Sequence, residues 1–380
     1  MKVGIEASPV INQGGLGSYT RNLIRALASI DPQGDYTLFF SPILPNVPLG
    51  GAERMRRVVV PTGNALARYF VTLPLALARE RIDVVHVQYA APPFCPARVV
   101  VTVHDLIHER YPEFYPHDMV VKYRAIVPLT IRHAAVVLTD SEYSKRDIMR
   151  RYCVPPDKVV VALCAAESAF QHVHDAARLA GVRARYGTGD HFILSVGNIE
   201  RRKNLKTLIA AYVRLLQAGV TCAKLVLVGS KGWLHDDVFV EARESGYVDQ
   251  LIFTEFVPEE DLVALYNAAE LFVYPSLFEG FGIPPLEAMA CGTPVVCSNT
   301  SSLPEVVGDA ALMVDPLDVD GLAETMAQVL RDAALRARLS AQGPRRAALF
   351  SWDRTARITL DTYRRAAEPD VQRRRWSNCR

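Results

Sequence analysis

Residues 271–289, LFVYPSLFEGFGIPPLEAM, contain a short apolar run, a glycine-bearing loop and the start of an amphipathic segment. The apolar run predicts a buried strand that ends near Ser276, and Pro284–Pro285 suit the first turn of a helix, where a backbone N–H is not needed. A strand, a short loop and a helix in this order form the repeating unit of a parallel α/β sheet. The stretch therefore predicts that class of fold, and it places Glu279 and Glu287 around the loop.

The same alternation of apolar runs and amphipathic segments occurs in both halves of the chain. Continuous apolar runs separated by helices predict parallel strands that are buried on both faces. We therefore expect an α/β fold of two Rossmann-like, doubly wound parallel-sheet domains that face each other across a cleft. The runs are MKVGIEA, IDVVHVQY, RVVVTVHDL and AAVVLTDS in the first half, and HFILSVGN, KLVLVGS, QLIFTEFV, LFVYPS and PVVCS in the second.

Changes in composition indicate the domain boundaries. Residues 172–190, HVHDAARLAGVRARYGTGD, lose the apolar strand pattern and end in Gly and Asp, so we interpret them as an interdomain linker. We expect an N-terminal domain at residues 1–171 and a C-terminal domain at residues 191–350. The segment 351–380 reads as a helix over residues 351–367 followed by a tail.

Composition narrows the classes of function. Half of the 380 residues are hydrophobic and 22% are charged, as in soluble globular proteins, and the net charge of +2 gives no reason to expect a nucleic-acid partner. The 7 cysteines form no CxxC pair, which predicts reduced thiols in a cytoplasmic protein. The stretch MKVGIEASPV lacks the apolar core of a secretory signal, and no apolar run approaches the length of about 18 residues that a spanning helix requires.

One segment suggests contact with a membrane surface. Residues 65–83, ALARYFVTLPLALARERID, mix an apolar face with three arginines, a pattern that can lie on anionic lipid. Pro74 instead favours a helix packed on the core, because it would interrupt an interfacial helix. Residues 1–172 carry 19 Lys and Arg against 15 Asp and Glu, a small basic excess. We expect at most a peripheral, salt-sensitive contact at the inner face of the plasma membrane.

The loop between Glu279 and Glu287 has the features of an anion site. Gly280 and Gly282 leave the backbone open, and the start of the following helix adds unpaired N–H groups with positive polarity. The two carboxylates would repel a phosphate, but they can accept hydrogen bonds from neutral hydroxyls on either side of it. A nucleotide sugar, which is a diphosphate with a sugar at each end, satisfies every part. The alternative is that both glutamates only complement the helix dipole.

Cations follow the strand HFILSVG, which ends at Gly197. Arg201, Arg202 and Lys203 precede a helix, and at the end of a strand they could neutralise a diphosphate and stabilise its departure. The alternative interpretation is a solvated basic turn.

Glycines and histidines mark the strand ends of the first half. Gly14, Gly15 and Gly17 precede a helix and allow close approach of the backbone to a ligand, while the absence of a GxGxxG pattern lowers the odds of a dinucleotide dehydrogenase. Of the histidines, we interpret His86 as a buried structural residue. His104 is the candidate that donates to a sugar hydroxyl or organises a transition state.

Three further patterns are interpreted as structural. Asp318 and Asp320 match a metal-binding DxD pattern, but they precede an amphipathic run, so Asp320 is expected to cap a helix. The stretch from Ser302 to Glu305 reads as a capping box. We predict no metal site, and we expect no serine hydrolase because Ser141 has no GxSxG context.

These motifs together resemble the large family 4 of retaining glycosyltransferases, in its mannosyltransferase-like group 1. EGFGIPPLE resembles the EX7E motif of that family, and VGNIERRKN resembles its phosphate-binding turn. Other landmarks occur in the expected order over nearly the whole chain: QGGLGSYTRNL, TVHDL, SEYSKRDI, LVLVGSKGW and LPEVVGDAALMVDP. The resemblance implies the GT-B fold, with the last helix crossing back onto the first domain. It also implies metal-independent transfer with retention, favoured to proceed by front-side attack.

The resemblance implies a role for each matching residue. Glu287 would bind ribose hydroxyls and Glu279 the donor sugar, while Val257 would lie near the nucleobase. The implied catalytic residues are His104, Arg202, Lys203 and Glu279. The implied donor contacts also include Gly14, Gly15, Gly197, Gly280, Phe281, Gly282 and Ile283. The chain departs from the family pattern at Asn198, where many relatives have arginine, in the segment 163–166, and at Glu255, where glycine is common.

The resemblance implies that the chain moves a hexose, for which we take mannose, onto a saccharide or lipid-linked saccharide in bacterial surface polysaccharide or lipopolysaccharide biosynthesis. The donor would be GDP-mannose or a UDP-sugar, with no cofactor besides this substrate. Two alternatives stay open: a GT-B sugar-nucleotide epimerase or phosphorylase, and a non-catalytic nucleotide-sugar-binding subunit. A phosphorylase would need a pyridoxal lysine, for which the sequence gives no candidate.

Overall fold

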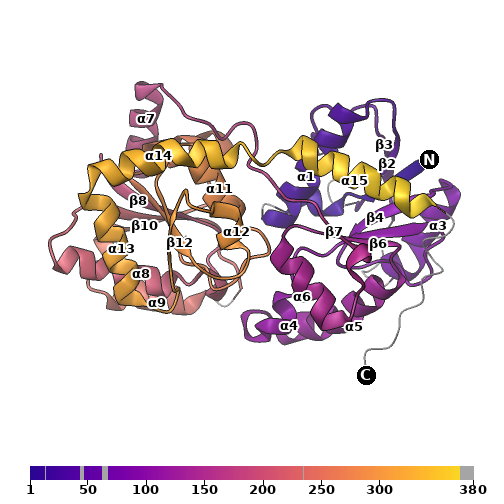
Figure 1. Cartoon of the computed structure of the whole chain (residues 1–380), viewed down its shortest axis with the longest axis horizontal. Helices are drawn as coiled ribbons and strands as arrows, with labels where there is room; N and C mark the ends of the chain where they lie inside the picture. Colours follow the sequence, from indigo (N-terminus) through magenta and orange to yellow (C-terminus); the bar gives the residue numbers. More distant parts are fainter. Residues whose placement is uncertain (13, 43–46, 62–66, 234, 369–380) are drawn as a thin grey trace. The chain divides into compact units, whose positions relative to one another are not determined.

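The structure is a computed structural model that describes residues 1–12, 14–42, 47–61, 67–233 and 235–368 (Figure 1). The described chain forms two compact units. Unit 1 contains Met1–Arg110, His117–Cys164 and the chain from Ser351, and unit 2 contains Tyr111–Pro116 and Ala165–Phe350. Each unit is an α/β layer structure with its own core.

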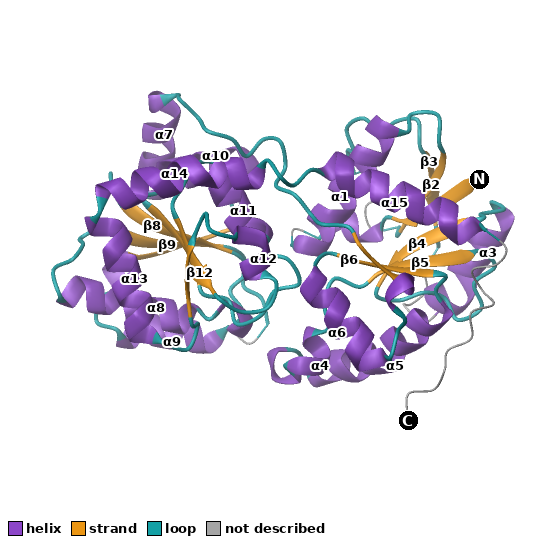
Figure 2. Cartoon of the chain, viewed as in Figure 1, coloured by secondary structure: helices purple, strands orange, loops and turns teal. Residues whose placement is uncertain are grey.

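Within the described residues, the sheet of unit 1 has seven parallel strands in the order β3-β2-β1-β4-β5-β6-β7 (Figure 2). Apolar β-branched residues fill its central strands, as expected for strands that are covered on both faces. The order reverses between β1 and β4, where Val3 pairs with Tyr36 on one side and with Val84 on the other. The strands are β1 (Lys2–Glu6), β2 (Asp35–Phe40), β3 (Arg56–Val59), β4 (Val84–Gln88), β5 (Arg98–Thr102), β6 (Val136–Thr139) and β7 (Val159–Val161).

The last helix of the described chain belongs to unit 1. Helix α15 (Trp352–Ala367) lies against α1 (Gly15–Ile30) and also contacts strands β4, β5 and β6. Ser141 caps α6 (Glu142–Tyr152) by accepting a hydrogen bond from the Ser144 N–H at 3.0 Å, as the sequence pattern predicts. The remaining helices are η1 (Ser8–Ile11), η2 (Arg68–Thr72), α3 (Leu73–Arg79), α4 (Ile107–Arg110), α5 (His117–His133) and η4 (Pro156–Lys158).

The sheet of unit 2 repeats this topology. Its described strands are all parallel in the order β10-β9-β8-β11-β12-β13, so the order reverses between β8 and β11. The fold class predicted from the sequence is therefore confirmed for the two parallel sheets. The strands are β8 (Phe192–Val196), β9 (Lys224–Val228), β10 (Leu251–Glu255), β11 (Leu271–Tyr274), β12 (Val295–Ser298) and β13 (Leu312–Val314).

Helices α8 (Leu205–Gln217), α9 (Asp236–Glu244) and α13 (Val319–Arg331) bury their apolar stripes in one core cluster with the strands of unit 2. Helix α14 (Ala333–Ala347) packs on α11 (Ile283–Ala290), and helix α7 (Ala176–Tyr186) packs on α10 (Glu259–Ala268). The shorter elements are α12 (Leu303–Val307), η3 (Pro112–Phe114), η5 (Arg201–Lys203) and η6 (Val248–Gln250).

The segment 172–190, which the sequence pattern assigns to a linker, contains α7 within unit 2. Asp175 caps this helix through the Arg178 N–H at 3.0 Å. Arg185 and Tyr186 both contact the Asp261 carboxylate on α10, at 2.7 and 2.8 Å. In the structure the division between the units falls between Cys164 and Ala165.

The cysteines do not all follow the sequence prediction. Cys153 is disulfide-bonded, so the expectation of a fully reduced set does not hold for this residue. Five others within the described chain are free thiols: Cys95, Cys164, Cys222, Cys291 and Cys297. No helix among the described residues is long and apolar enough to cross a bilayer.

Candidate functional site

The carboxyl ends of β8 and β11 bring together two of the motifs singled out in the sequence. The strands are neighbours at the point where the strand order of unit 2 reverses, which is where open α/β sheets bind ligands. The loops that follow them are joined directly. The Leu277 N–H donates to the Arg202 carbonyl oxygen at 2.9 Å, and the Ser276 hydroxyl oxygen lies 3.1 Å from the same carbonyl oxygen.

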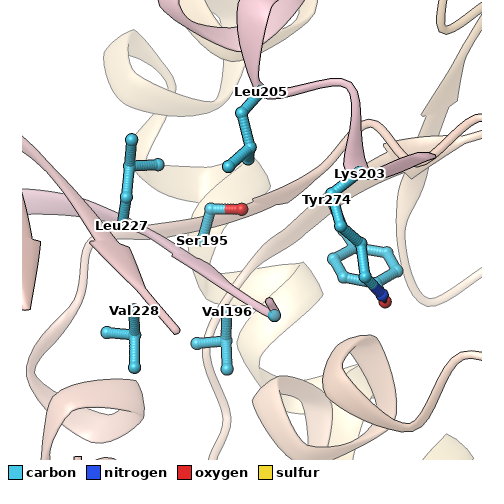
Figure 3. A pocket seen from close by; sticks show the side chains of 8 residues that line it. Ser195, Val196, Lys203, Leu205, Leu227, Val228 and Tyr274 are labelled. Carbon is cyan, nitrogen blue, oxygen red and sulfur yellow. Dashed lines mark hydrogen bonds between the residues drawn. The ribbon is translucent and has the colours of Figure 1, made fainter. Parts of the chain in front are cut away.

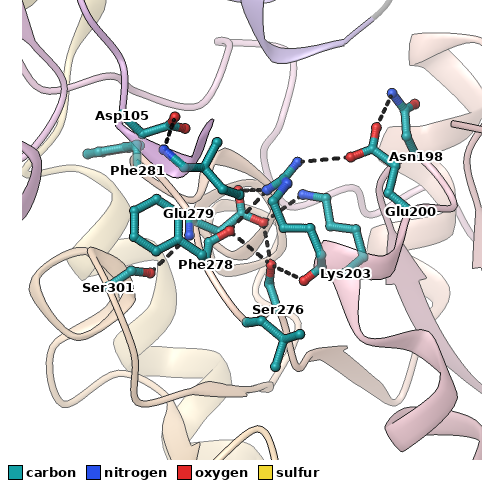
Figure 4. A network of polar contacts seen from close by, with 12 residues as sticks. Asp105, Asn198, Glu200, Lys203, Ser276, Phe278, Glu279, Phe281 and Ser301 are labelled. Carbon is teal, nitrogen blue, oxygen red and sulfur yellow. Dashed lines mark hydrogen bonds and ion pairs between the residues drawn. The ribbon is translucent and has the colours of Figure 1, made fainter. Parts of the chain in front are cut away.

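Glu279 lies at the centre of a polar network in this place (Figure 4). Its Oε1 accepts hydrogen bonds from Lys203 Nζ at 2.7 Å, from the Tyr274 hydroxyl at 2.8 Å and from the Ser276 hydroxyl at 2.6 Å. Its Oε2 pairs with Arg202 Nη1 at 2.6 Å. Every one of these side chains is buried or nearly so, which strengthens each electrostatic interaction.

The network determines how its members ionise. Burial alone raises the pKa of the Glu279 carboxyl, but the charges of Arg202 and Lys203 overcome this effect and lower the pKa to about 2. Burial and the neighbouring Arg202 charge lower the pKa of Lys203, while Glu279 opposes them. Glu279 is therefore a carboxylate throughout the physiological range, held between two cationic side chains.

A second carboxylate supports Arg202. Glu200 Oε2 lies 3.5 Å from Arg202 Nη2, and Glu200 is itself packed against Gly232, where an added Cβ would lie 2.3 Å from the Glu200 side chain. Arg202 Nη1 also donates to the Phe278 carbonyl oxygen at 3.1 Å. Its Nε is buried without a hydrogen-bond partner among the described residues, so this guanidinium retains one donor for a further acceptor.

The third cation of the turn points elsewhere. Arg201 Nε lies 3.2 Å from Asp237 Oδ2 on α9, and the Arg201 side chain is about half exposed. Gly197, at the end of β8, has φ of +146°, and a Cβ there would lie 3.1 Å from Lys203 Cε. Glycine at this position therefore gives Lys203 room to reach Glu279.

Lys203 and Tyr274 form one side of a small cavity (Figure 3). Strands β8, β9 and β11 supply most of its walls, and the side chains around it are mainly apolar. The residues that line it are Ser195, Val196, Gly197, Lys203, Leu205, Leu227, Val228 and Tyr274.

Two serines fix the loop that carries Glu279. The single O–H of Ser302 is shared between the carbonyl oxygens of Glu279 and Phe281, which lie 2.9 and 2.7 Å from the Ser302 oxygen. The Ser301 hydroxyl accepts from the Glu279 N–H at 3.0 Å. The capping-box prediction for Ser302 is therefore wrong, because its hydroxyl is occupied by the loop and makes no cap hydrogen bond in α12.

The glycine before α11 is required by its surroundings. Gly282 has φ of +117° and ψ of +58°, and an added Cβ would lie 2.7 Å from Leu303 Cδ2. Ile283 then begins the helix, and the preceding Phe281 is buried with its ring 5.7 Å from that of Phe350. Gly280 lies in the same loop, between Glu279 and Phe281. The arrangement keeps the loop close to the start of α11, whose first N–H groups carry positive polarity.

Glu287 ionises in the opposite way to Glu279. It lies on α11, and its Oε2 accepts a hydrogen bond from the Tyr266 hydroxyl of α10 at 2.9 Å. Burial raises the pKa of the Glu287 carboxyl to about 8; the Tyr266 hydrogen bond opposes this rise, while Glu167 and Glu259 add to it. Around neutral pH the environment of Glu287 therefore favours the protonated carboxyl, in contrast to that of Glu279.

The position expected near the nucleobase lies between β10 and α10. Val257 is buried there, two residues before α10 begins. The departure at Glu255 has a backbone counterpart, since this residue has φ of +57°, in the left-handed region that glycine enters most easily.

Unit 1 presents a second cluster at its own strand ends. Gly14 caps α1, and Gly15, the first residue of that helix, has open space around it. Gly17 has a different role from the expected one, because a Cβ there would lie 1.8 Å from the Asn12 carbonyl oxygen. Its missing side chain therefore accommodates the backbone of Asn12 and Pro9.

His104 follows β5 in this cluster and is buried. Its Nδ1 lies 2.5 Å from Asp140 Oδ2, and its Nε2 lies 3.0 Å from Gln88 Oε1. His86 is also buried, and its ring nitrogens contact the hydroxyls of Tyr363 and Thr102, both at 2.7 Å. His86 is thus tied into the interior of unit 1, whereas His104 lies at the strand ends.

The DxD pattern is accounted for by helix capping. Asp318, and not Asp320, caps α13, by accepting from the Gly321 N–H at 2.8 Å. Asp320 lies in the first helical turn and pairs with Arg214. Among the residues that the structure describes, no three His, Cys, Asp or Glu side chains are grouped as metal ligands would be.

Several residues of the two clusters were missed by the sequence patterns. The hydroxyl donors next to Glu279 were available in the stretch YPS, which ends the strand before the loop. The partners of His104 had no such signal, because Gln88 and Asp140 come from two other strands. The missed residues are Tyr274, Ser276, Ser301 and Ser302 in unit 2, and Gln88 and Asp140 in unit 1.

Two family profiles match the chain. The profile described as Glycosyltransferase Family 4 matches residues 13–166, and the one described as Glycosyl transferases group 1 matches residues 183–346. An O-antigen chain mannosyltransferase B from Escherichia coli is 38% identical over 268 residues, which cover 70% of this chain and 70% of that protein. The serotype-specific mannosyltransferase WbdA from Escherichia coli is 34% identical over 283 residues, which cover 71% of this chain and 34% of that protein.

Solved structures share the fold. Sucrose-phosphate synthase from Thermosynechococcus elongatus superposes with a TM-score of 0.79 at 23% identity, over 96% of this chain and 98% of that one. WaaG, a glycosyltransferase involved in lipopolysaccharide biosynthesis, gives a TM-score of 0.77 at 16% identity, over 95% and 99%. With these GT-B neighbours, the two profiles and the sequence relatives all agreeing, the chain belongs to the group 1 glycosyltransferases of family 4.

Proposed function

We propose that the chain transfers a hexose, which we take to be mannose, from a nucleotide diphosphate sugar to a saccharide acceptor with retention of configuration. The observation that carries the proposal is the network around Glu279, in which one ionised carboxylate meets two cations beside a glycine loop and a helix start. A nucleotide sugar needs both kinds of group side by side: a carboxylate that accepts from the sugar hydroxyls, and cations that bind the diphosphate.

The network supports a division of roles among its members. Arg202 and Lys203 would bind the diphosphate, and the unpartnered Arg202 Nε supplies a donor that Glu279 does not use. Glu279 would then position hydroxyls of the hexose. Its Oε1 already accepts from three side chains, which makes it a poor nucleophile and favours a positioning role.

The remaining positions follow the family resemblance. Glu287 would bind the ribose hydroxyls, and Val257 would lie beside the nucleobase. The backbone around Gly197 and from Gly280 to Ile283 would line the phosphates and the sugar. From unit 1, the Gly14–Gly15 backbone would approach the donor phosphates, and His104 would lie beside the transferred hexose. Charge stabilisation of the departing diphosphate would supply the largest part of the rate. No metal has a role in this proposal.

The relatives support the choice of donor and acceptor. The sequence relatives named above are an O-antigen chain mannosyltransferase and a serotype-specific mannosyltransferase. We therefore propose GDP-mannose as the donor, with UDP-sugars as the competing candidates. The acceptor would be a lipid-linked saccharide in bacterial surface polysaccharide synthesis, and the chain would act on the cytoplasmic side.

A peripheral membrane contact through the segment 65–83 forms part of the proposal. Residues 65 and 66 of this segment lie outside the described chain. Phe70, Val71 and Leu75 are exposed on η2 and α3, which supports contact with lipid. Arg68 does not contribute, because it pairs with Glu6 and Ser8 at the end of β1. A flotation assay should show binding to anionic liposomes at low salt that Leu75→Ser weakens; absence of a bound fraction would remove this part.

Incubation with a panel of nucleotide sugars, with slow donor hydrolysis as the readout, tests the proposal. We expect GDP-mannose to be consumed fastest, with Glu287→Ala weakening nucleotide binding. His104→Ala should leave binding unchanged and slow transfer. Conversion of the donor to an epimer, or tight binding without turnover under any condition, would instead establish the epimerase or the non-catalytic subunit.

A further inference from the structure

The hydrogen-bond partners of His104 determine its protonation state. Both atoms that face its ring nitrogens are oxygens: a carboxylate oxygen of Asp140 at 2.5 Å and the amide oxygen of Gln88 at 3.0 Å. A carboxylate oxygen and an amide oxygen carry no proton to donate. Both hydrogen bonds therefore require a proton on each ring nitrogen, which is the imidazolium form.

The orientation of the Gln88 amide follows from a chain of contacts that begins at a backbone carbonyl. The Thr20 hydroxyl lies 2.7 Å from the Leu16 carbonyl oxygen on α1, and Gln88 Nε2 lies 2.5 Å from the same hydroxyl. A carbonyl oxygen can only accept, so Thr20 donates to Leu16 and accepts from the Gln88 NH₂ group. The Gln88 amide oxygen is thereby left facing His104.

The charges around His104 agree with this assignment. Burial alone lowers the pKa of the imidazole, but the charge and hydrogen bond of Asp140, with a contribution from Asp105, raise the pKa above its ordinary value. The other rings packed on it offer no competing charge: Tyr19 of α1 lies edge-on at 4.7 Å, and Tyr89 lies at 5.5 Å. The Tyr19 hydroxyl is engaged with Thr102 at 3.1 Å.

His86, on β4, provides an internal comparison. Both of its ring nitrogens contact hydroxyl groups. A hydroxyl can donate as well as accept a hydrogen bond, whereas the carboxylate and amide oxygens around His104 can only accept. Burial, with a smaller effect of the His104 charge, lowers the pKa of His86 to about 3. Two buried histidines of one unit are thus held in opposite states.

We propose that Asp140 and Gln88 hold His104 as an imidazolium, so that His104 serves as a fixed positive charge and not as a proton acceptor. Asp140 and Gln88 are positioning residues, with Thr20 fixing the direction of the amide. The catalytic meaning rests on the proposed function. A cation beside the hexose stabilises the negative charge on the departing diphosphate.

This assignment also fixes where the proton of the acceptor goes. As the bond between the acceptor oxygen and the anomeric carbon forms, the bond to the diphosphate oxygen breaks. The acceptor hydroxyl then loses its proton to the departing diphosphate, because His104 has no free lone pair to take it. A neutral His104 would instead be a candidate general base.

Ring ¹⁵N chemical shifts of the full chain, labelled at histidine, test the proposal. The His104 signals can be identified by their loss in His104→Asn. We expect both ring nitrogens of His104 to stay protonated as the pH rises past the ordinary histidine pKa of about 6.5. In the same spectra His86 should stay neutral down to about pH 5. A single deprotonated nitrogen on His104 at about pH 6.5 would overturn the proposal.

Variants separate a positioning role from a merely structural one. Asp140→Asn should lower the pKa of His104 by at least about one unit and reduce kcat about tenfold without changing the donor KM. Gln88→Glu should raise the His104 pKa by about one unit, which a loss of structure cannot do. Asp147→Asn, on α6, removes a carboxylate that is bonded to Arg110 of α4; it is the matched control and should leave the His104 titration unchanged. An unchanged His104 pKa in both Asp140→Asn and Gln88→Glu would contradict the proposal.

The outcomes keep this inference distinct from the proposed function. The ¹⁵N titration does not require turnover, so an imidazolium in a chain that transfers no sugar would sustain the inference and remove the proposed function. Transfer activity together with a neutral His104 would sustain the proposed function and remove the inference.

Discussion

Glu279 and Glu287 belong to one short motif, yet their environments drive their ionisation apart. Glu279 lies among Arg202, Lys203 and two hydroxyl donors, and its pKa is lowered to about 2. Glu287 has one neutral donor, the Tyr266 hydroxyl, and burial raises its pKa to about 8. Both side chains are carboxyls of the same motif, and the cations that the β8 turn supplies contact Glu279. An acidic motif in a sequence therefore does not specify an acidic site.

Glu279→Gln tests the ionised member and should have the largest effect. The variant keeps the shape but removes the counter-charge of the buried Lys203 and leaves Arg202 with Glu200 alone, which should cost about 3 kcal/mol of unfolding free energy. Transfer activity should fall below detection. Urea unfolding at pH 7 measures the first effect; a loss below about 1 kcal/mol would show that the pair is weakly coupled.

The same variant has a distinct dependence on pH. A lowered native pKa gives stability that is present above the unfolded value of about 4.3 and is lost as the pH falls toward 2. Wild-type chain should therefore lose this contribution in that window, whereas Glu279→Gln should not. Parallel unfolding curves for the two proteins between pH 5 and pH 2 would contradict the assignment.

Lys203→Met removes one of the two cations that keep Glu279 ionised. Loss of the buried cation that we propose to bind the diphosphate should weaken nucleotide binding by about 10- to 100-fold, since a charge-assisted hydrogen bond contributes ~1.5–3 kcal/mol. Calorimetry with a nucleoside diphosphate measures it. Arg201→Met is the matched control, because Arg201 pairs with Asp237 on the outside of the turn, and it should change the Kd less than about twofold.

Glu287→Gln tests the protonated member. A raised native pKa gives stability that is fully present below the unfolded value of about 4.3 and is lost as the pH rises toward 8. The glutamine cannot ionise, so the stability of the variant relative to wild type should increase by up to ~1.4 kcal/mol per pH unit across this window. Denaturation at pH 5, 7 and 9 measures the trend, and a constant difference would refute it.

Ser302→Ala should have the smallest effect. It removes the hydrogen bond that the Ser302 hydroxyl shares between two loop carbonyls, which should cost about 1 kcal/mol of stability and raise the donor KM a few-fold. Thermal unfolding and steady-state kinetics measure these quantities. If stability falls but the donor KM stays at the wild-type value, the loop does not need this support to bind the donor.

Much of this arrangement could be predicted from the sequence because it depends on local patterns. Apolar runs such as FILSV and LFVY predict buried parallel strands, and the Pro284–Pro285 pair predicts the start of α11. With parallel strands established, the loops that follow β8 and β11 were expected at the same edge of a sheet. The contact between Lys203 and Glu279, 76 residues apart, is a consequence of that topology.

Other features depend on the environment of a residue and had no local signal. The proton on Glu287 reflects burial, which the spacing of EX7E does not reveal. Ser302 matches a capping box by residue type, but tertiary contacts to the Glu279 loop take its hydroxyl instead. The acceptors of His104 come from β4 and from the end of β6, so only the folded sheet brings them together.

Helix α15 has a consequence for how the protein is made. The chain leaves unit 1 at Cys164 and returns to it at Ser351, so unit 2 is completed on the ribosome before the last element of unit 1 emerges. Until then, His86 lacks the Tyr363 hydroxyl, a partner 277 residues further along the chain. The surface of α1 that α15 covers in the folded protein is therefore exposed during this interval. A chaperone would protect the nascent chain most at this stage of biosynthesis.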